Sequence, residues 1–586
     1  MIPIGIKGII MRKNNPNRWH FTLQTNANGY AYVYAYQTAW DPVAKRSRRT
    51  AKKYVGRLHE DGRVDVSPKF AELVPDYAQG EFFYGADKTL VSKAEYLYDF
   101  PEKTGPAPEE GEDVGDAPST RTLGVVWAAE QIAEQSGLLA DLKECFGKEY
   151  ALDLLHLALY KLDAGNAMAG YDDWRQQVVL RNARRLSSQR ISEILSAVSR
   201  DDFDKYFKLR HVRKLNQADG ASLNYALDNT SISTYSRTIV DAAFGHAKRD
   251  PELRQINYTF VCDQDTGDIV FVHAYEGSIN DVVALQEILY RMKNAGLALE
   301  KVVLVTDRGY SSILNVQKMI NLELKFIQGV RIVEDVVKKR LDDYRESLSS
   351  LSFYNAGLNA YARSIDEPWT ENTGTAAVPH TVHMHLYRFP GVDEAERVAA
   401  AKKAEELVQL KNDGKMVPPA LRQTHGHFLT KVEKDEKEVW QRNDRAIEEA
   451  CRYAGMFVLR SNTVANPFEA LRIYGMRNAV ELDFNQFKNW LDGDRLRCTE
   501  TSYLGKLFIT TLGTSLRMMM LNRLRANRGE DLPVYYDSLD GVFSKLRSVL
   551  ADKRPQAHAW VCRTLTKKQR EMLTLLGVPL PPRVLR

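Results

Sequence analysis

A chain of 586 residues is too long to fold around a single hydrophobic core, so several domains are expected. With 44% hydrophobic residues, 27% charged residues and a formal charge of +5, the composition is ordinary for a soluble globular protein and permits a nucleic-acid partner without establishing one. Five widely separated cysteines without a Cys-x2-Cys pair exclude a zinc ribbon and a disulfide framework, and no apolar run reaches the length of a membrane span.

The N-terminal segment predicts a β-rich domain over residues 1–100. Its first residues, MIPIGIKGIIMRK, are interrupted by Lys7 and form too short an apolar run for a signal sequence, so a cytoplasmic protein is expected. The alternating aromatic run GYAYVYAYQTAW is typical of a strand. The next segment, KRSRRTAKKYVGR, carries seven cations and is interpreted either as a solvated hairpin or as an arm that contacts phosphates, which makes this a candidate DNA-binding domain.

A linker and a helical domain are expected next. Residues 101–120 hold four Pro, three Gly and six acidic residues, with little that could be buried, and are typical of a linker. Residues 121–215 show helical periodicity and include the basic run RQQVVLRNARRLSSQRISEIL. This part is either a second candidate DNA-binding module or a scaffold.

Residues 216–331 predict the first part of a mixed α/β core. LNYALDNTSIS is expected to be a short strand with Asp228 near its C-terminal end, and a hairpin with Gly267 in its turn follows. A helix capped by Asn280 or Asp281 leads to a buried strand, EKVVLVTDRGYSS, that ends at Asp307. A further helix and strand complete the order strand, hairpin, helix, strand, helix, strand.

The remaining chain is expected to contain an insertion and the second part of the core. Residues 332–454 are polar and charged and predict an inserted subdomain. Residues 455–530 return to the pattern of the core, with a strand, a helix that bears Glu481 and a long apolar helix. Residues 531–586 predict a small helical region with basic ends.

The segment RIYGMRNAVELDFNQFKNWLDGD, residues 472–494, is predicted to be one helix with two stripes. At about 100° per residue, Tyr474, Arg477, Glu481 and Lys488 share a stripe roughly 60° wide, beside a separate apolar stripe. Arg477 and Glu481 can form an ion pair, whereas Glu481 and Lys488 lie about 10 Å apart along the axis and cannot. Taken alone, the pattern also fits a solvated helix face.

Three carboxylates stand where a metal site is expected. Asp228 and Asp307 lie at or just after strand ends, where open α/β sheets bind ligands, and Glu481 follows the last core strand. Converging carboxylates favour Mg²⁺ or Mn²⁺, and two such ions about 3.5–4 Å apart can activate the attacking oxygen and stabilise the leaving oxygen at a phosphodiester. Taken singly, each Asp is more typical of a turn cap, which is what most Asp residues at strand ends are.

These acids and their surroundings resemble the DDE transposases of bacterial insertion sequences. The matching elements are LDNTSI with Asp228, VTDRGY with Asp307, the intervening segment QINYTFVCDQDTGDIVFVHAYEGSINDV and a complete Tyr-x2-Arg-x3-Glu-x6-Lys signature. The resemblance covers roughly residues 220–330 and 455–512. YEGSIND departs mildly from the family's usual run, and the first 215 residues and the C-terminus carry no matching motif.

The resemblance implies a ribonuclease H-like mixed-sheet core in which Asp228, Asp307 and Glu481 are catalytic and hold two Mg²⁺ or Mn²⁺ ions. Tyr474, Arg477 and Lys488 would contact the DNA end near the scissile phosphate. The implied enzyme binds the terminal inverted repeats of its element, cleaves there and joins the 3′-hydroxyls to target DNA. It would act as a homodimer in a synaptic complex, in the bacterial cytoplasm and with the nucleoid, without a membrane partner.

Two other functions stay open. A catalytically silent DNA-binding or regulatory protein derived from a transposase would usually have lost one of the carboxylates, and none is missing here. A ribonuclease H-like nuclease would need no inverted repeats beside its gene, so the flanking DNA distinguishes it from a transposase.

Overall fold

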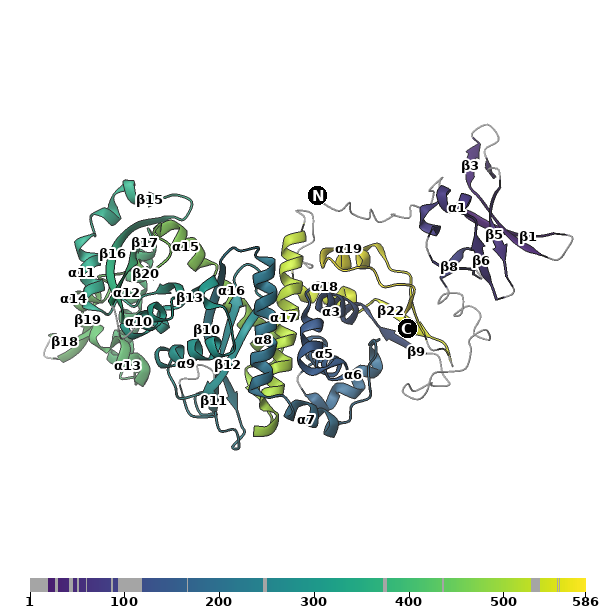
Figure 1. Cartoon of the computed structure of the whole chain (residues 1–586). Helices are drawn as coiled ribbons and strands as arrows, with labels where there is room; N and C mark the ends of the chain where they lie inside the picture. Colours follow the sequence, from purple (N-terminus) through teal and green to yellow (C-terminus); the bar gives the residue numbers. More distant parts are fainter. Residues whose placement is uncertain are drawn as a thin grey trace. The chain divides into compact units, whose positions relative to one another are not determined.

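The computed structural model (Figure 1) describes most of the chain. The chain folds into two compact units. The described residues are 19–26, 30–41, 46–49, 52–59, 61–78, 80–85, 88–92, 119–165, 167–245, 250–372, 377–434, 437–528, 538–555, 557 and 559–585. Residues 101–118 of the predicted linker lie outside them. The first unit comprises residues 1–128, 175–184 and 540–586, and the second comprises residues 129–174 and 185–539.

The N-terminal part of the first unit is an antiparallel sheet of six strands, which confirms the β-rich prediction. In spatial order the strands are β1 (His20–Thr25), β2 (Ala31–Tyr36), β5 (Lys53–Leu58), β6 (Arg63–Val66), β7 (Phe82–Tyr84) and β8 (Leu90–Ser92). One face packs against helix α1 (Pro68–Leu73), where Phe21, Val33 and Phe70 are buried in one hydrophobic cluster. Strands β3 (Thr38–Asp41) and β4 (Arg46–Arg49) pair as a separate ribbon that contains the start of the basic run.

The C-terminal part of the first unit is mixed, so the prediction of a helical region is wrong in this respect. Its sheet runs β24 (Val584–Leu585), β23 (Trp560–Cys562), β22 (Leu550–Lys553) and β9 (Ser119–Thr122), accompanied by helices α18 (Leu539–Leu546) and α19 (Lys567–Leu575). Strands of two to four residues are too short to show alternation. Moreover, β22 pairs with a segment that precedes it by more than 400 residues, as in the bond from Thr120 to Asp552.

Helices dominate the chain from α3 to α8, as predicted. They are α3 (Gly124–Gln135), α4 (Leu138–Phe146), α5 (Lys148–Asp163), α6 (Tyr171–Gln177), α7 (Ser188–Ser196) and α8 (Arg200–Gln217). In the second unit, α5 and α7 pack against the long helix α17 (Tyr503–Asn527). Gly505 permits this close packing, because a Cβ at this position would lie 2.1 Å from the carbonyl oxygen of Leu195. The buried Arg210 joins α8 to Asp141 of α4 at 3.0 Å and to Asp268 of the core.

The second unit is built on a large mixed sheet, which makes the chain a mixed α/β protein. Its first five strands in spatial order are β12 (Ile269–Glu276), β11 (Arg254–Asp263), β10 (Leu223–Thr234), β13 (Val302–Thr306) and β14 (Lys325–Gly329). Strand β11 is antiparallel to both of its neighbours, β10 and β12, whereas β13 and β14 run parallel to β10. Helices α9 (Asp281–Asn294) and α10 (Ile313–Asn321) connect β12 to β13 and β13 to β14, so the predicted order of elements is confirmed.

The region predicted as an inserted subdomain contributes strands to the same sheet. Beyond β14 the sheet continues through β20 (Met456–Ser461), β17 (Ala377–Arg388), β16 (Ala360–Asn372) and β15 (Tyr354–Asn355). The rest of the region forms a small core of its own, in which Ala404 of helix α12 (Val392–Asn412) packs with Phe428, Ile447 and Cys451. The region is therefore partly an extension of the sheet and partly an appendage to it.

Candidate active site

The register of two parallel strands brings Asp228 and Asp307 together. Leu227 of β10 pairs with Thr306 of β13, and the residues that follow these two are Asp228 and Asp307. Asp307 follows β13 directly, as predicted. The expectation that Asp228 ends a short strand is wrong, because β10 has 12 residues and Asp228 is the sixth. The mostly polar residues after Asp228 show no strand pattern in the sequence, yet in the structure they form the second half of β10 and continue its antiparallel pairing with β11.

The segment that carries Glu481 is not the single helix predicted. Helix α15 (Pro467–Gly475) ends just before helix α16 (Asn478–Asn485), and a π-helical turn, η9 (Gln486–Trp490), follows. The interruption follows Gly475, a residue type with low helix propensity. The predicted apolar stripe is present, because Phe260 of β11 stacks on Phe484 at 5.0 Å and meets the edge of Phe487 at 5.3 Å. These ring contacts hold α16 and η9 against β11.

Arg477 lies among all three acids. Its Nη1 donates to Oδ2 of Asp228 at 3.1 Å, and its Nη2 donates to Oε1 of Glu481 at 2.9 Å and lies 4.0 Å from Oδ1 of Asp307. The hydroxyl of Tyr474 donates to Oδ1 of Asp307 at 3.1 Å. The predicted Arg477–Glu481 ion pair is therefore confirmed, and five of the six candidate site residues form one cluster.

Burial and charge set the protonation of this cluster. Burial, with further contributions from Asp307 and Asp281, raises the pKa of Asp228 to about 6, although the Asn229 N–H and Arg477 oppose the shift. Burial alone would lower the pKa of Arg477, but the surrounding Tyr474 and carboxylates outweigh it and raise that pKa. The guanidinium therefore stays charged, and it neutralises part of the acidic cluster.

Sequence reasoning missed two residues beside Asp228. The backbone N–H of Asn229 donates to Oδ1 of Asp228 at 2.8 Å, and the side-chain Nδ2 of Asn229 donates to Oδ1 of Asp281 at 3.1 Å. Asn280 caps α9, which leaves the neighbouring Asp281 to bond with β10. In the sequence, the Asn-Asp pair at the helix start signals this contact only weakly, because the same pair fits two alternative helix caps.

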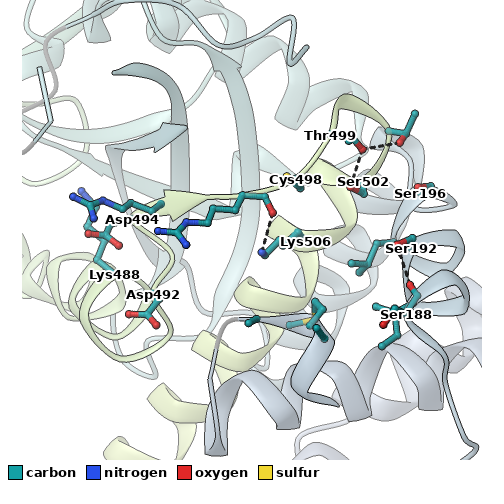
Figure 2. Close-up of a pocket in the computed structure, with 18 of the residues that line it drawn as sticks. Ser188, Ser192, Ser196, Lys488, Asp492, Asp494, Cys498, Thr499, Ser502 and Lys506 are labelled. Atoms are coloured by element: carbon teal, nitrogen blue, oxygen red, sulfur yellow. Dashed lines mark hydrogen bonds between the residues drawn. The ribbon is translucent and has the colours of Figure 1, made fainter. Parts of the chain in front are cut away.

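The sixth candidate, Lys488, lies in a separate cleft of about 970 Å³. Figure 2 shows Lys488, Asp492 and Asp494 on one side of this cleft, the serines of α7 on the other and Lys506 between them. Arg495 and Arg497 also line it, with hydroxyl side chains that include Thr499 and Ser502. The cleft thus presents four basic side chains, two acidic ones and several hydroxyls. The basic side chains and the hydroxyls are of the kinds that contact phosphates in DNA complexes, whereas the two carboxylates are not.

Each of the three carboxylates of the cluster has an oxygen within 4.0 Å of the Arg477 guanidinium. Across the described ranges, no group of three or more His, Cys, Asp or Glu side chains is placed to hold a metal ion. Nor does any helix there have the length and apolar character needed to cross a membrane.

A fourth carboxyl, Asp483, is fully buried in α16 two residues after Glu481. Burial raises the pKa of Asp483 well above its usual range, although its contact with the thiol of Cys262 acts in the opposite direction. A carboxyl whose pKa is higher in the folded protein contributes stability below its unfolded pKa of about 4 and loses it as the pH rises toward the folded pKa. Asp483 therefore makes the fold less stable at neutral pH than at pH 4.

We expect Asp483→Asn to flatten the pH dependence of stability. The wild-type free energy of unfolding should carry a contribution that falls by up to about 1.4 kcal/mol per pH unit as the pH rises above about 4, and the variant should lack it. Urea unfolding at several pH values measures this slope. Asp483→Leu should change the slope in the same direction, and equal slopes in the wild type and both variants would contradict the assignment.

Comparisons with known proteins find distant similarity to solved structures. No protein-family model matches the chain, and no curated protein matches it. Among solved structures, a cryo-EM structure of a piggyBac transposase synaptic complex with hairpin DNA is similar, with 12% sequence identity and a TM-score of 0.32. The similarity covers 78% of this chain and 84% of that chain.

Proposed function

We propose that the chain is a DDE transposase that binds the ends of its own insertion sequence, cleaves them with a divalent metal and joins the 3′-hydroxyls to target DNA. The observation that carries this proposal is the meeting of Asp228, Asp307 and Glu481 around Arg477. These acids come from two neighbouring strands and a helix more than 150 residues further along the chain. Turn caps and a solvated helix face do not explain why they converge.

The sheet supports a ribonuclease H-like core. Numbered by their order in the chain, the first five strands are arranged 3-2-1-4-5, with the second antiparallel to the first and the last two parallel to it. This is the strand order of ribonuclease H-like folds. It places the acid-bearing positions of the first and fourth strands side by side.

The donor set fits Mg²⁺ in its chemistry. Asp228, Asp307 and Glu481 would hold the metal, since hard divalent cations favour carboxylate oxygens. The place among these acids already holds a cation, the guanidinium of Arg477, so metal binding requires that side chain to move. When bound, the metal would stabilise charge on the phosphate oxygens and activate the attacking oxygen.

The side chains around the acids have separate tasks in this proposal. Tyr474 orients Asp307 through its hydroxyl, and the backbone of Asn229 orients Asp228. Arg477, displaced from the acids, offers a planar pair of N–H donors to a phosphate. Lys488 and the other cations of its cleft would hold the backbone of the DNA end, with a homodimer pairing two ends.

The test is cleavage of a plasmid that carries the gene for this chain with its native flanking DNA. The purified protein is incubated with Mg²⁺ or Mn²⁺, and the breaks are mapped to single nucleotides. We expect metal-dependent cuts at both ends of the element. Binding to the ends without cutting would instead favour a silent DNA-binding protein, and cuts unrelated to the ends would favour a nuclease.

A further inference from the structure

The sheet of the N-terminal domain has one face that its own core does not cover. On β2, Val33 and Ala35 point into the hydrophobic cluster, so Tyr32, Tyr34 and Tyr36 point to the opposite face. We call this opposite face the tyrosine face. On its neighbouring strands it also includes His20 of β1 and Tyr54 and Arg57 of β5.

Cross-strand pairs organise the tyrosine face. Tyr36 lies opposite His20, and their rings stack with centroids 5.5 Å apart. Tyr34 lies opposite Tyr54, and the edge of one ring meets the face of the other at 5.8 Å. Tyr54 is 45% exposed, so this aromatic group is not a second core. Tyr32, Tyr34 and Tyr36 are partly exposed, and a cluster of aromatic side chains that reaches the surface of a sheet indicates a site that binds a partner.

The charge at the tyrosine face is positive. Arg49 of β4 lies over the ring of Tyr36 at 4.6 Å, and Arg57 of β5 lies over the ring of Tyr30 at 4.2 Å. Residues 46–58 include six Lys and Arg residues and no acidic residue. On the adjacent strand, Asp65 is already paired with His59 and Arg63. This distribution complements a polyanion.

The arrangement of the rings favours double-stranded DNA over unpaired bases. Unpaired bases bind by stacking on free aromatic faces, but Arg49 and Arg57 already lie over the rings of Tyr36 and Tyr30, and His20 stacks on Tyr36. The hydroxyl groups and guanidinium N–H groups remain suited to phosphate oxygens and base edges. The major groove of B-form DNA is wide enough to admit a β-ribbon.

We propose that the tyrosine face of the N-terminal sheet binds the duplex DNA of the element ends. The identity of that DNA rests on the proposed transposase function, whereas duplex binding by this face does not. The sequence offers two candidate DNA-binding modules. The proposal assigns end binding to the first, residues 19–92, and not to the helices of residues 121–215.

The test measures binding of the full-length protein by fluorescence anisotropy over a series of KCl concentrations. The probes are a 30-bp duplex from the DNA that flanks the gene, a scrambled duplex of equal length and one strand of the first duplex. The double variant Arg49→Gln/Arg57→Gln should bind the flanking duplex at least tenfold more weakly. Its slope of log affinity against log salt should fall by about 2, since each lost phosphate contact contributes about 0.9.

A matched control removes two cations from elsewhere in the same domain. Lys69 lies on α1, which covers the opposite face of the sheet, and Lys88 lies in the turn between β7 and β8. Lys69→Gln/Lys88→Gln should change affinity less than twofold. Tyr32→Phe/Tyr34→Phe keeps the rings and removes only hydroxyls, so it should weaken duplex binding while the melting temperature stays the same.

Three results would overturn the proposal: unchanged binding by the arginine variant, an equal loss in the control variant, or wild-type preference for the single strand over the duplex. Equal affinity for the flanking and scrambled duplexes would remove the assignment to the element ends. Failure of the transposase function is a separate outcome. In that case the wild type would cut no DNA, yet duplex binding would still depend on the tyrosine face.

Discussion

Glu481→Gln is expected to reduce metal-dependent cleavage at the element ends by at least about 10³-fold, equivalent to about 4 kcal/mol in the activation barrier. The variant keeps the shape of the side chain but loses one of the three carboxylates that are proposed to hold the metal. Its stability should hardly change, because the Glu481 side chain is 56% exposed and an exposed i,i+4 pair with Arg477 contributes only about 0.3–0.5 kcal/mol. Mapped plasmid cleavage and urea unfolding measure the two effects on the same preparation.

The matched control is Glu469→Gln in α15, the helix just before that of Glu481. This variant has the same change of charge and should cleave within about twofold of the wild type. Binding of the flanking duplex should be retained in both variants, since neither removes a cation. Cleavage by Glu481→Gln at the wild-type rate would remove Glu481 from the site and leave the ion pair as its sole role.

The acid positions were predictable because their signals are local. The buried run VVLVT identifies β13, and Asp307 follows it immediately. The turn around Gly267, which has a positive φ of 62°, identifies the hairpin between β11 and β12. Alternation, apolar runs and turn residues depend only on nearby sequence, so the strands and turns that they predict can be recognised without knowledge of the tertiary structure.

The features that were not predictable depend on distant parts of the chain. The pairing of β9 with β22 joins segments at opposite ends of the sequence. The second half of β10 is stabilised as a strand by its neighbour β11, although all of its residues except Ile232 are polar. The break between α15 and α16 places Arg477 outside a regular helix. The assumption of one straight helix therefore groups Tyr474, Arg477 and Glu481 correctly. It also places Lys488 on the same stripe, whereas in the structure Lys488 lies in a separate cleft.

The position of Arg477 has a consequence for metal binding. In the sequence it was assigned to DNA by resemblance, but in the structure it contacts the three acids and its side chain is only 11% exposed. A guanidinium among the carboxylates keeps them together, and it would compete with the divalent cation that we propose. DNA could shift this balance, because a phosphate that attracts Arg477 would leave the acids free for metal.

Arg477→Gln is therefore expected to destabilise the metal-free protein and to raise its affinity for Mn²⁺. Unpaired carboxylates repel each other, and because they are partly exposed to water we expect a loss of about 1–3 kcal/mol in the free energy of unfolding rather than the larger cost of a fully buried pair. Removal of the competing charge should strengthen Mn²⁺ binding at least tenfold, or about 1.4 kcal/mol, in calorimetry at pH 7.5. Added Mn²⁺ should then raise the melting temperature of the variant more than that of the wild type.

Two further variants decide whether the acids are the metal ligands. Arg477→Lys keeps a positive charge and should show little of the gain in Mn²⁺ affinity. Arg477→Gln/Asp228→Asn removes a ligand as well and should bind Mn²⁺ more weakly than Arg477→Gln alone. Below pH 6 the gain should shrink, since burial raises the pKa of Asp228 to about 6 and loss of Arg477 would raise it further, so protons compete with the metal. If Mn²⁺ binds Arg477→Gln no better than the wild type at pH 7.5, these carboxylates are not the cation site, and the mechanism proposed for the chain fails with them.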